Sequence, residues 1–597
     1  MNQGRKINAP EEVKNFKEAI LDLIKYCKPY MVAILLAIFL SIVSAILSII
    51  GPDKLRDITN FITNGLLTGI NLNEVKDITI ILAIIYIISA VFNYLQHFIM
   101  ATVTNKFSKQ LRKEITTKIN NMPLKYFDKN SYGDILSRIT NDVDTLTQTL
   151  HQSIGHLVSS ITLFIGSGLM MFITNGIMAI TAIISSVMGF LFMFLIIGKS
   201  QKYFLLLQKE LGKLNGHIEE MYSAHNVVKV YNGTNKSISD FDEINNRLSE
   251  NVQKSQFLSG LMHPIMGFIG NFGYVCVCIV GAMLTMSGKI DFGVIVAFMI
   301  YVRLFTQPLS QIAQSVTSLQ STAAASERVF EFLAEEEMEK ESHITKKLAR
   351  NEVLGKIEFK HVKFGYSEDK TIIKDFNVLV NPGNKIAIVG ETGAGKTTMV
   401  NLLMKFYDIK DGDILIDGIS TKELTRQNIH DLLIMVLQDT WVFEGTVKEN
   451  IKYNNQDVSD ETVKEVCKTV GLHHFIKTLP NGYDTILTDS ESLSQGQKQL
   501  LTIARGMIKD APFLILDEAT SSVDTRTEEL VQKAMDKLTE TRTSFIIAHR
   551  LSTIKNADLI LMMENGNIIE MGNHKELIKL NGKYAELYNS QFEKIES

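Results

Sequence analysis

The chain has few cysteines for its length and no dense cluster of them. The four cysteines among its 597 residues are Cys27, Cys276, Cys278 and Cys467. Their spacing matches neither a disulfide framework nor a zinc motif, so we expect them to pack as small apolar residues. The chain also lacks an excess of charge of either sign, because its formal net charge is −4. This balance excludes nucleic acid as a bulk electrostatic partner.

Charge is also missing from long stretches of the first half. Residues 31–50 hold no charged side chain, and roughly 20 apolar residues cross about 30 Å of hydrocarbon. The run is too long for the apolar part of a secretory signal peptide and lacks a small-residue cleavage site. We therefore predict membrane spans, six in all. They lie near residues 31–50, 78–101, 152–174, 176–198, 257–286 and 290–313.

Lysine and arginine are frequent in the N-terminal segment and in the loops after spans two and four. This bias predicts that both chain termini face the cytoplasm. Apolar residues at helical spacing continue span two as far as Pro123, which extends the helix by roughly 30 Å. The loop after span four has the same pattern through Met221. We predict two cytoplasmic stalks that contact a soluble domain.

The predicted fold class is an all-α membrane domain with six helices, followed by an α/β domain. Residues 1–28 carry an amphipathic helix, which lies at the membrane surface or is simply solvated. The membrane domain covers 29–325, a charged linker 326–354, and the α/β domain 355–597. Only about thirty residues precede the first span, too few for an N-terminal protease domain.

Residues 390–398 read Gly-Glu-Thr-Gly-Ala-Gly-Lys-Thr-Thr and match the pattern G-x-x-x-x-G-K-[ST] in full. A β-branched run precedes them and a helical pattern follows. Gly393 and Gly395 let backbone N–H groups turn toward phosphate oxygens, Lys396 reaches the terminal phosphates, and Thr397 offers a hydroxyl to Mg²⁺. This pattern predicts a nucleoside triphosphate site. The predicted contacts are Gly390, Thr392, Gly393, Ala394, Gly395, Lys396, Thr397 and Thr398.

A pair of acids follows a second apolar run, residues 513–516. At the end of such a strand, Asp517 can hold the water shell of Mg²⁺. Glu518 is then placed to orient the attacking water or accept its proton. The two motifs together predict hydrolysis of the bound nucleotide.

With further motifs, the second half resembles the nucleotide-binding domain of an ABC transporter. Leu493-Ser-Gln-Gly-Gln497 is similar to the signature motif of that family, and Ser521-Ser-Val-Asp524 to its D-loop. Gln438 and His549 stand where the family keeps its Q-loop glutamine and switch histidine. Tyr366 matches the aromatic residue that stacks on adenine. The resemblance implies ATP and Mg²⁺ as cofactors, with Lys396, Gln438, Glu518 and His549 as catalytic residues and Thr397, Gln438 and Asp517 around the metal ion.

The resemblance also implies an assembly of two chains. ATP would lie between Lys396 of one chain and the signature residues Ser494, Gly496 and Gln497 of the other. The six spans and their stalks resemble the type IV exporter fold, with residues 123–138 and 217–230 similar to its coupling regions. The chain is most similar to the catalytically intact half of heterodimeric bacterial multidrug exporters, which favours a heterodimer over a homodimer.

Two positions depart from the family pattern. Gln495 replaces the glycine usual at the third signature position, and residues 489–492 lack a glycine common there. The latter departure bears on the contact with the coupling regions. Trp441, the only tryptophan, stands near this region and is expected to serve packing.

The function that these features favour is ATP-driven export of amphiphilic or lipophilic compounds across the bacterial plasma membrane by alternating access. The expected partners are a second half-transporter, the lipid bilayer and a small amphiphilic substrate. A lipid flippase of the same fold and an ATP-gated channel or regulator remain alternatives. Inside the predicted spans, His97, His263 and Arg303 are candidates for substrate contact. The two histidines are equally consistent with positions facing headgroups or water between helices.

Overall fold

The computed structural model describes residues 15–367, 370–437, 440–487, 493–517, 525–547 and 551–592. The chain divides into two compact units. The first, which we call the helical unit, comprises Met1–Asn120 and Tyr132–Glu336. The second, the sheet unit, comprises Asn121–Ser131 and Glu337–Ser597.

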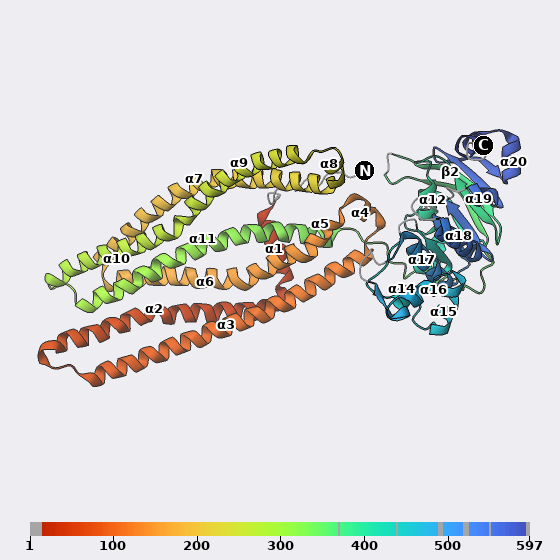
Figure 1. The fold of residues 1–597 in the computed structure, drawn as a ribbon. Helices are drawn as coiled ribbons and strands as arrows, with labels where there is room; N and C mark the ends of the chain where they lie inside the picture. Colours follow the sequence, from red (N-terminus) through yellow and green to blue (C-terminus); the bar gives the residue numbers. More distant parts are fainter. Residues whose placement is uncertain are drawn as a thin grey trace. The chain divides into compact units, whose positions relative to one another are not determined.

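Six long helices carry the apolar stretches of the helical unit, and Figure 1 draws them as coiled ribbons. They are α2 (Met31–Thr68), α3 (Leu72–Asn121), α6 (Val143–Thr174), α7 (Gly176–Ser223), α10 (Met262–Met286) and α11 (Phe292–Ala334). Within the described residues, five helical stretches are long and apolar enough to cross a membrane, and α7 adds the shorter apolar stretch Gly176–Met188. The predicted all-α membrane domain is thereby confirmed, and these stretches together are consistent with six spans.

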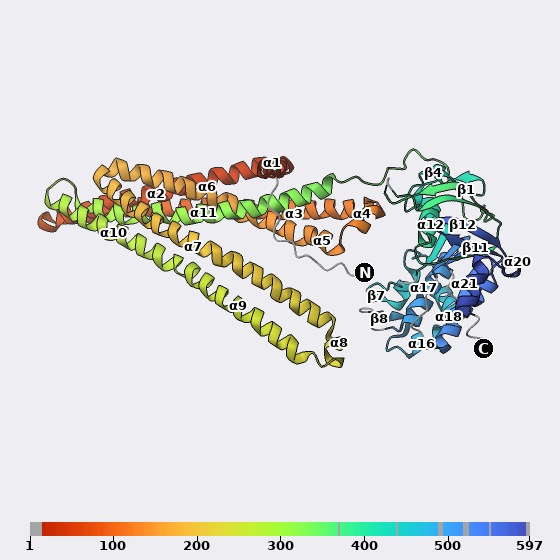
Figure 2. The ribbon, with the colours of Figure 1, turned by 90° about the horizontal axis from the view of Figure 1, so that it is seen from above.

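Two of these helices continue well beyond their apolar stretches, as the spacing predicted. The second predicted span runs on as α3 to Asn121, and the fourth as α7 to Ser223. After α7, the short helix α8 (His225–Val230) turns the chain, and α9 (Thr234–Gly260) returns alongside α7, as both views show (Figure 2). The pair α7 and α9 forms a long helical hairpin with α8 at its tip.

Shorter elements complete the helical unit. They are α1 (Phe16–Tyr26), the 3₁₀ helix η1 (Lys28–Tyr30), α5 (Tyr132–Ser137) and the π-helix η2 (Arg138–Asp142). The helix expected before the first span is thus present from Phe16. It packs against α11, where the hydroxyl of Ser326 donates to the carbonyl of Ala19 at 2.8 Å.

The core of the helical unit lies between α2, α6, α7, α10 and α11. The rings of Phe164 and Phe305 stack with centroids 4.6 Å apart, and the buried Tyr301 donates to the carbonyl of Ile49 at 3.4 Å. By contrast, only 11% of the most apolar stretch of α3 is buried. Exposed apolar side chains of this extent are what a helix in contact with lipid requires.

Two segments belong to a different part of the structure from the one that the sequence-based domain bounds assigned to them. Residues 326–334, assigned to the linker from sequence, form the last part of α11. Residues 121–131 belong to the sheet unit although they follow α3 directly. This segment holds the short helix α4 (Leu124–Lys129), and Leu124 packs against the sheet core.

A ten-stranded sheet forms the centre of the sheet unit, in the order β5-β4-β1-β2-β12-β11-β3-β10-β9-β6. The strands β11, β3, β10, β9 and β6 are parallel, whereas β1 pairs antiparallel with β2 and β4. A separate pair, β7 and β8, is antiparallel. The strands are β1 (Ile357–Phe364), β2 (Ile373–Val380), β3 (Lys385–Val389), β4 (Asp411–Ile416), β5 (Ile419–Ser420), β6 (Leu433–Val436), β7 (Gly445–Thr446), β8 (Ile486–Leu487), β9 (Phe513–Asp517), β10 (Thr543–Ile547), β11 (Leu559–Glu564) and β12 (Asn567–Gly572).

Helices cover both faces of this sheet, so the central strands are buried on both sides. Along β3, Ala387 and Val389 point into one apolar core, and Ile386 and Ile388 into the other. The helices are α12 (Lys396–Leu403), η3 (Thr421–Glu423), α13 (Arg426–Leu432), α14 (Val447–Lys452), α15 (Asp460–Thr469), α16 (His473–Thr478), η4 (Gly482–Asp484), α17 (Gln495–Lys509), α18 (Thr525–Thr539), α19 (Leu551–Lys555), α20 (His574–Leu580) and α21 (Lys583–Phe592). The predicted α/β domain is confirmed.

Candidate functional site

The candidate site lies at one edge of the parallel part of the sheet. Strands β3, β6, β9 and β10 run in the same direction, so their carboxyl ends meet at that edge. Ligands of open α/β sheets bind at such ends. In the sequence, Gln438 follows β6, Glu518 follows β9 and His549 follows β10. These three residues lie outside the described part of the chain.

The loop after β3 depends on glycine. Gly390, Gly393 and Gly395 have φ of +153°, +89° and +101°, values that residues with a side chain rarely adopt. A Cβ at Gly390 would overlap the carbonyl oxygen of Met563, and one at Gly395 would come within 2.9 Å of Ile373. The loop therefore turns tightly against β2 and β11 and leads directly into α12.

Lys396, the first residue of α12, reaches back over this loop. Its Nζ donates to the carbonyl oxygens of Gly390 at 2.6 Å and Glu391 at 3.0 Å. Burial lowers the pKa of Lys396, while the nearby carboxylate of Asp517 opposes that shift. The structure thus places the lysine of the glycine-rich loop close to the acid at the end of β9, the two residues that the sequence assigned to the phosphates and the metal ion.

Threonines and one tyrosine complete the described side of the site. Thr392 and Thr397 are exposed, whereas Thr398 is buried. The hydroxyl groups of Tyr366 and Thr398 lie 3.2 Å apart in a hydrogen bond. The ring of Tyr366 stands edge-on to that of Tyr407, with centroids 5.0 Å apart. The aromatic residue predicted at the nucleotide is therefore tied to the helix that follows the phosphate loop.

The signature residues begin a separate helix of the sheet unit, α17. Ser494 caps it: its hydroxyl accepts from the N–H of Gln497 at 3.3 Å, and the side chain of Gln497 accepts from the N–H of Ser494 at 2.9 Å. Gly496 is buried in the first turn. A capped helix start directs free N–H groups and the positive end of the helix dipole outward.

This geometry fits a nucleoside triphosphate. The three left-handed glycines turn backbone N–H groups inward, and Lys396 adds a cation beside them. The hydroxyl of Thr397 and the carboxylate of Asp517 are hard oxygen donors of the kind that Mg²⁺ prefers.

Comparison with known proteins agrees with the site. The family model for the ABC transporter transmembrane region matches residues 34–309, and the ABC transporter model matches residues 373–521. The chain is 41% identical to a fatty acid ABC transporter ATP-binding/permease protein of Mycobacterium bovis, over 87% of this chain and 82% of that protein. It is 39% identical to the ABC transporter ATP-binding protein YfiC of Bacillus subtilis, over 94% and 92% of the two chains. It is 31% identical to a probable multidrug resistance ABC transporter ATP-binding/permease protein of Bacillus subtilis, over 87% and 77%.

The chain belongs to the ABC transporter family. It is an exporter half-transporter of the type IV fold, and it binds ATP and couples ATP hydrolysis to transport. ABC half-transporters generally work as dimers.

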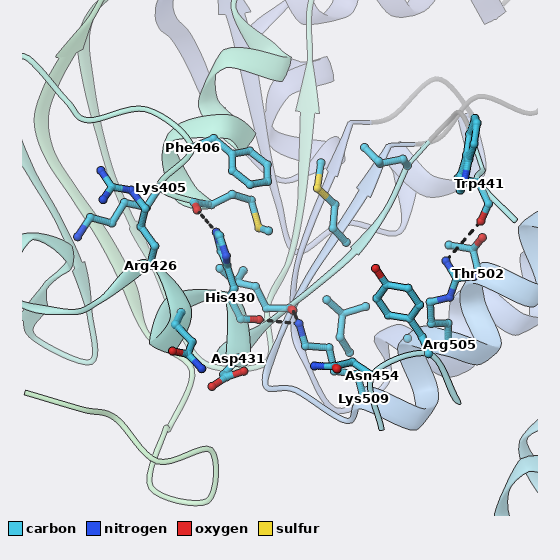
Figure 3. A pocket seen from close by; sticks show the side chains of 18 of the residues that line it. Lys405, Phe406, Arg426, His430, Asp431, Trp441, Asn454, Thr502, Arg505 and Lys509 are labelled. Carbon is cyan, nitrogen blue, oxygen red and sulfur yellow. Dashed lines mark hydrogen bonds between the residues drawn. The ribbon is translucent and has the colours of Figure 1, made fainter. Parts of the chain in front are cut away.

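The ABC transporter has a groove in its sheet unit that the sequence did not reveal. Figure 3 shows this groove, whose volume is about 870 Å³. Phe406 and Trp441 line it, together with Leu124 from α4. Trp441 is 71% exposed, so the expectation that it serves packing is wrong. In the sequence, the single tryptophan was the only feature that pointed to this groove.

Arg505 of α17 forms one wall of this groove (Figure 3). Its Nε donates to the carbonyl of Asn450 at 2.9 Å, and its guanidinium lies 5.1 Å from the ring centroid of Tyr453. Burial lowers the pKa of Arg505, and the cation–π contact and hydrogen bonds offset that burial. Arg505 thereby joins the signature helix to the groove wall.

The candidate substrate residues lie in the helical unit of the ABC transporter. Arg303 is exposed on α11, although its neighbours Tyr301 and Val302 are buried. The ring of His97 on α3 lies near His151 and His156 of α6. His263 belongs to α10, but its side chain lies outside the described part.

Proposed function

We propose that the chain is one half of an ATP-driven exporter of amphiphilic or lipophilic compounds. The membrane helices alternate between inward and outward openings as two nucleotide-binding domains close and separate. The protein resides in the bacterial plasma membrane with both termini in the cytoplasm. This orientation rests on the distribution of lysine and arginine among the loops.

One observation carries the proposal of an amphiphilic cargo. A groove of about 520 Å³ lies between α2 and α3, within their apolar stretches. Hydroxyl groups and aromatic rings line it side by side, among them Ser48, Tyr86 and Tyr94. Such mixed lining suits a compound with both polar and apolar parts. The fatty acid in the name of the Mycobacterium relative is one compound of this type.

The complete ATP site requires a second chain. Lys396 and the loop before it bind the phosphates from one side, and Ser494 with the start of α17 binds them from the partner. Thr397, Asp517 and Gln438 would hold Mg²⁺, which would offset phosphate charge. Glu518 orients the attacking water, and His549 contacts the terminal phosphate. The favoured partner is a different half-transporter, by resemblance to heterodimeric exporters.

The helical hairpin of α7 and α9 provides the mechanical link. At its tip, Tyr222, Val230 and Tyr231 are each at least 76% exposed. An apolar surface of this kind requires a partner. The groove around Trp441 is apolar and solvent-accessible, and we infer that it receives the tip of the partner chain.

The test is transport by the purified protein in lipid vesicles. The native mass of the gently solubilised complex, with its subunits identified, is measured first and defines what is reconstituted. Wild type should hydrolyse ATP in a Mg²⁺-dependent manner and transport a fluorescent amphiphile, whereas Glu518→Gln should bind ATP but lose both activities by roughly 10²-fold or more. A neutral change far from the site, His474→Ala, is the matched control.

Three outcomes separate the alternatives. Persistent substrate movement in Glu518→Gln would replace the pump by an ATP-gated channel. Transport of two-chain lipids alone would favour a flippase. Absence of ATPase activity in the reconstituted native complex would contradict the proposal.

A further inference from the structure

Four polar side chains lie where α3 and α6 come into contact in the helical unit. They are Gln96 and His97 of α3 and His151 and His156 of α6, and we call them the histidine cluster. The ring centroid of His97 lies 5.9 Å from that of His156 and 6.5 Å from that of His151. Gly155 permits this approach, because a Cβ there would overlap Nε2 of Gln96.

The cluster holds buried polar atoms without partners. Gln96 is only 4% exposed, yet its Nε2 has no hydrogen-bond partner among the described residues. Nδ1 of His151 is also buried and, within the same described part, unpartnered. Native proteins rarely leave such atoms unpaired. Amide and imidazole N–H groups without partners are suited to donate hydrogen bonds to a ligand.

The surrounding helices supply no acid that could accept these bonds. No aspartate or glutamate occurs in residues 31–52, 78–113, 145–174 or 292–326, which cover the facing parts of α2, α3, α6 and α11. The nearest acid on α6, Asp144, is two turns away and pairs with Arg112 at 2.5 Å. The described residues also contain no cluster arranged to hold a metal ion. The unpartnered nitrogens of Gln96 and His151 therefore have no acidic side chain to bind on these helix segments.

The groove between α2 and α3 begins at this cluster. His97 lines one end of it, and Tyr86 lies eleven residues away along α3, which is about 16 Å of helix. The serine hydroxyl groups that line the groove already hydrogen-bond to one another. Oγ of Ser89 lies 3.0 Å from Oγ of Ser44 and 3.2 Å from Oγ of Ser48. The three serines of the groove wall are thus already hydrogen-bonded, whereas the buried nitrogens of Gln96 and His151 in the histidine cluster are not.

We propose that the histidine cluster binds the oxyanion headgroup of an amphiphile whose apolar tail lies in the groove between α2 and α3. This inference rests on the proposed export function and names the chemical class of its cargo. An oxyanion accepts several N–H hydrogen bonds at once. The headgroup is a carboxylate or a phosphate, since both offer the same acceptor chemistry.

Binding of radiolabelled lipids to the native complex in nanodiscs tests this assignment. The probes share one oleyl or oleoyl chain and differ in headgroup: oleate, oleoyl lysophosphatidate, oleyl alcohol and oleylamine. The variants are the triple change His97→Ala, His151→Ala, His156→Ala, the single changes Gln96→Leu and His156→Gln, and the control His474→Ala. His474 is an exposed histidine of α16 in the sheet unit.

The triple variant should bind at least one of the two anions about tenfold more weakly or worse, because hydrogen bonds to a charged group are lost. Gln96→Leu should weaken it to a smaller extent, and His156→Gln, which keeps an N–H donor, should retain most of the affinity. Affinity for oleyl alcohol and the effect of His474→Ala should stay near wild type. A loss confined to oleate identifies a carboxylate cargo, and a loss confined to lysophosphatidate a phosphate cargo.

Unchanged binding of both anions in the triple variant would overturn the assignment, as would equal weakening of oleylamine. If the triple variant misfolds, the single variant His156→Gln still provides a folded protein, because this exposed position tolerates glutamine without repacking. ATP-dependent uptake of a neutral amphiphilic dye is measured in parallel. Failure of dye uptake in wild type contradicts the export function itself. The comparison of binding among the lipid headgroups tests the histidine cluster independently of transport.

Discussion

The hydroxyl of Tyr407 donates a hydrogen bond to the carboxylate of Asp128, a residue 279 positions earlier in the chain. Burial and this hydrogen bond raise the pKa of Tyr407, so the phenol keeps its proton. The ring of Tyr407 also contacts Tyr366, whose hydroxyl bonds to Thr398 in the helix after the phosphate loop. The segment after α3 is thereby connected to the ATP site through two tyrosines.

Tyr407→Phe should weaken the coupling between substrate and ATPase. A hydrogen bond to a charged group contributes about 1.5–3 kcal/mol, and the exposure of Asp128 places the value near the lower end. We expect stimulation of ATPase by substrate to fall severalfold while ATP affinity stays near wild type. ATPase assays with and without an amphiphile measure the first, and equilibrium nucleotide binding the second. Tyr483→Phe, which removes a hydrogen bond to His473 in the same unit, should leave coupling intact; an equal effect would refute the connection.

Gly390→Ala should destabilise the sheet unit and abolish ATP binding. The new Cβ would overlap the carbonyl of Met563, and the overlap together with the φ of +153° costs roughly 2 kcal/mol or more. Gly383 is the matched control, because its φ is +78° but nothing lies within 4 Å of a Cβ there. Gly383→Ala should cost only about 1–2 kcal/mol of backbone strain. Thermal unfolding with and without ATP compares the two, and equal shifts would contradict a packing role for Gly390.

ATP affinity should fall at alkaline pH before an ordinary lysine titrates. Burial lowers the pKa of Lys396, and the phosphates bind its protonated form. Above that lowered pKa, affinity should drop up to about tenfold per pH unit, because one proton must be taken up on binding. Lys396→Arg should flatten the dependence, since arginine remains charged. Binding of a fluorescent ATP analogue between pH 7 and 10 is the measurement, and an identical slope in both proteins would assign the drop to another group.

Arg303→Ala should reduce transport of anionic amphiphiles. Arg303 lies about 16 Å along α11 from its start, on the exposed side of the helix. An arginine facing lipid at such depth costs about 2.5–3.5 kcal/mol, so we infer that it faces a water-filled cavity. Initial uptake rates in vesicles should fall for anions and less for neutral compounds. Lys289→Ala, in the exposed turn before α11, is the control; unchanged transport of every compound would remove Arg303 from the pathway.

The phosphate loop could be predicted because its signal is local. Nine consecutive residues fix the turns, the lysine and the start of α12. The extent of α2 could not be predicted in this way, since the uncharged run ends at residue 50 whereas the helix continues to Thr68. The helix continues because Arg56 pairs with Asp53 at 2.8 Å and with Asp57 at 3.1 Å, which neutralises charge along its own surface.

Long-range contacts account for what the sequence did not reveal. The contact of Asp128 with Tyr407 joins residues that no local pattern relates. The groove around Trp441 likewise gathers side chains from several loops and helices. Gln96 and Gly155 form their close contact only because α3 and α6 cross at that point. Each of these features depends on tertiary packing rather than on periodicity.

The assignment of residues 121–131 to the sheet unit bears on how such proteins can be recombined. A chimera that exchanges the chain only after Glu337 would carry foreign partners for Leu124 and Asp128. Residues 121–131 of the original protein would then pack against the sheet unit of the other protein, with which they did not evolve. The sheet unit, which carries the ATP site, is therefore discontinuous in the sequence. A working exchange between two such proteins must also include the eleven residues 121–131, which lie between two membrane spans in the chain.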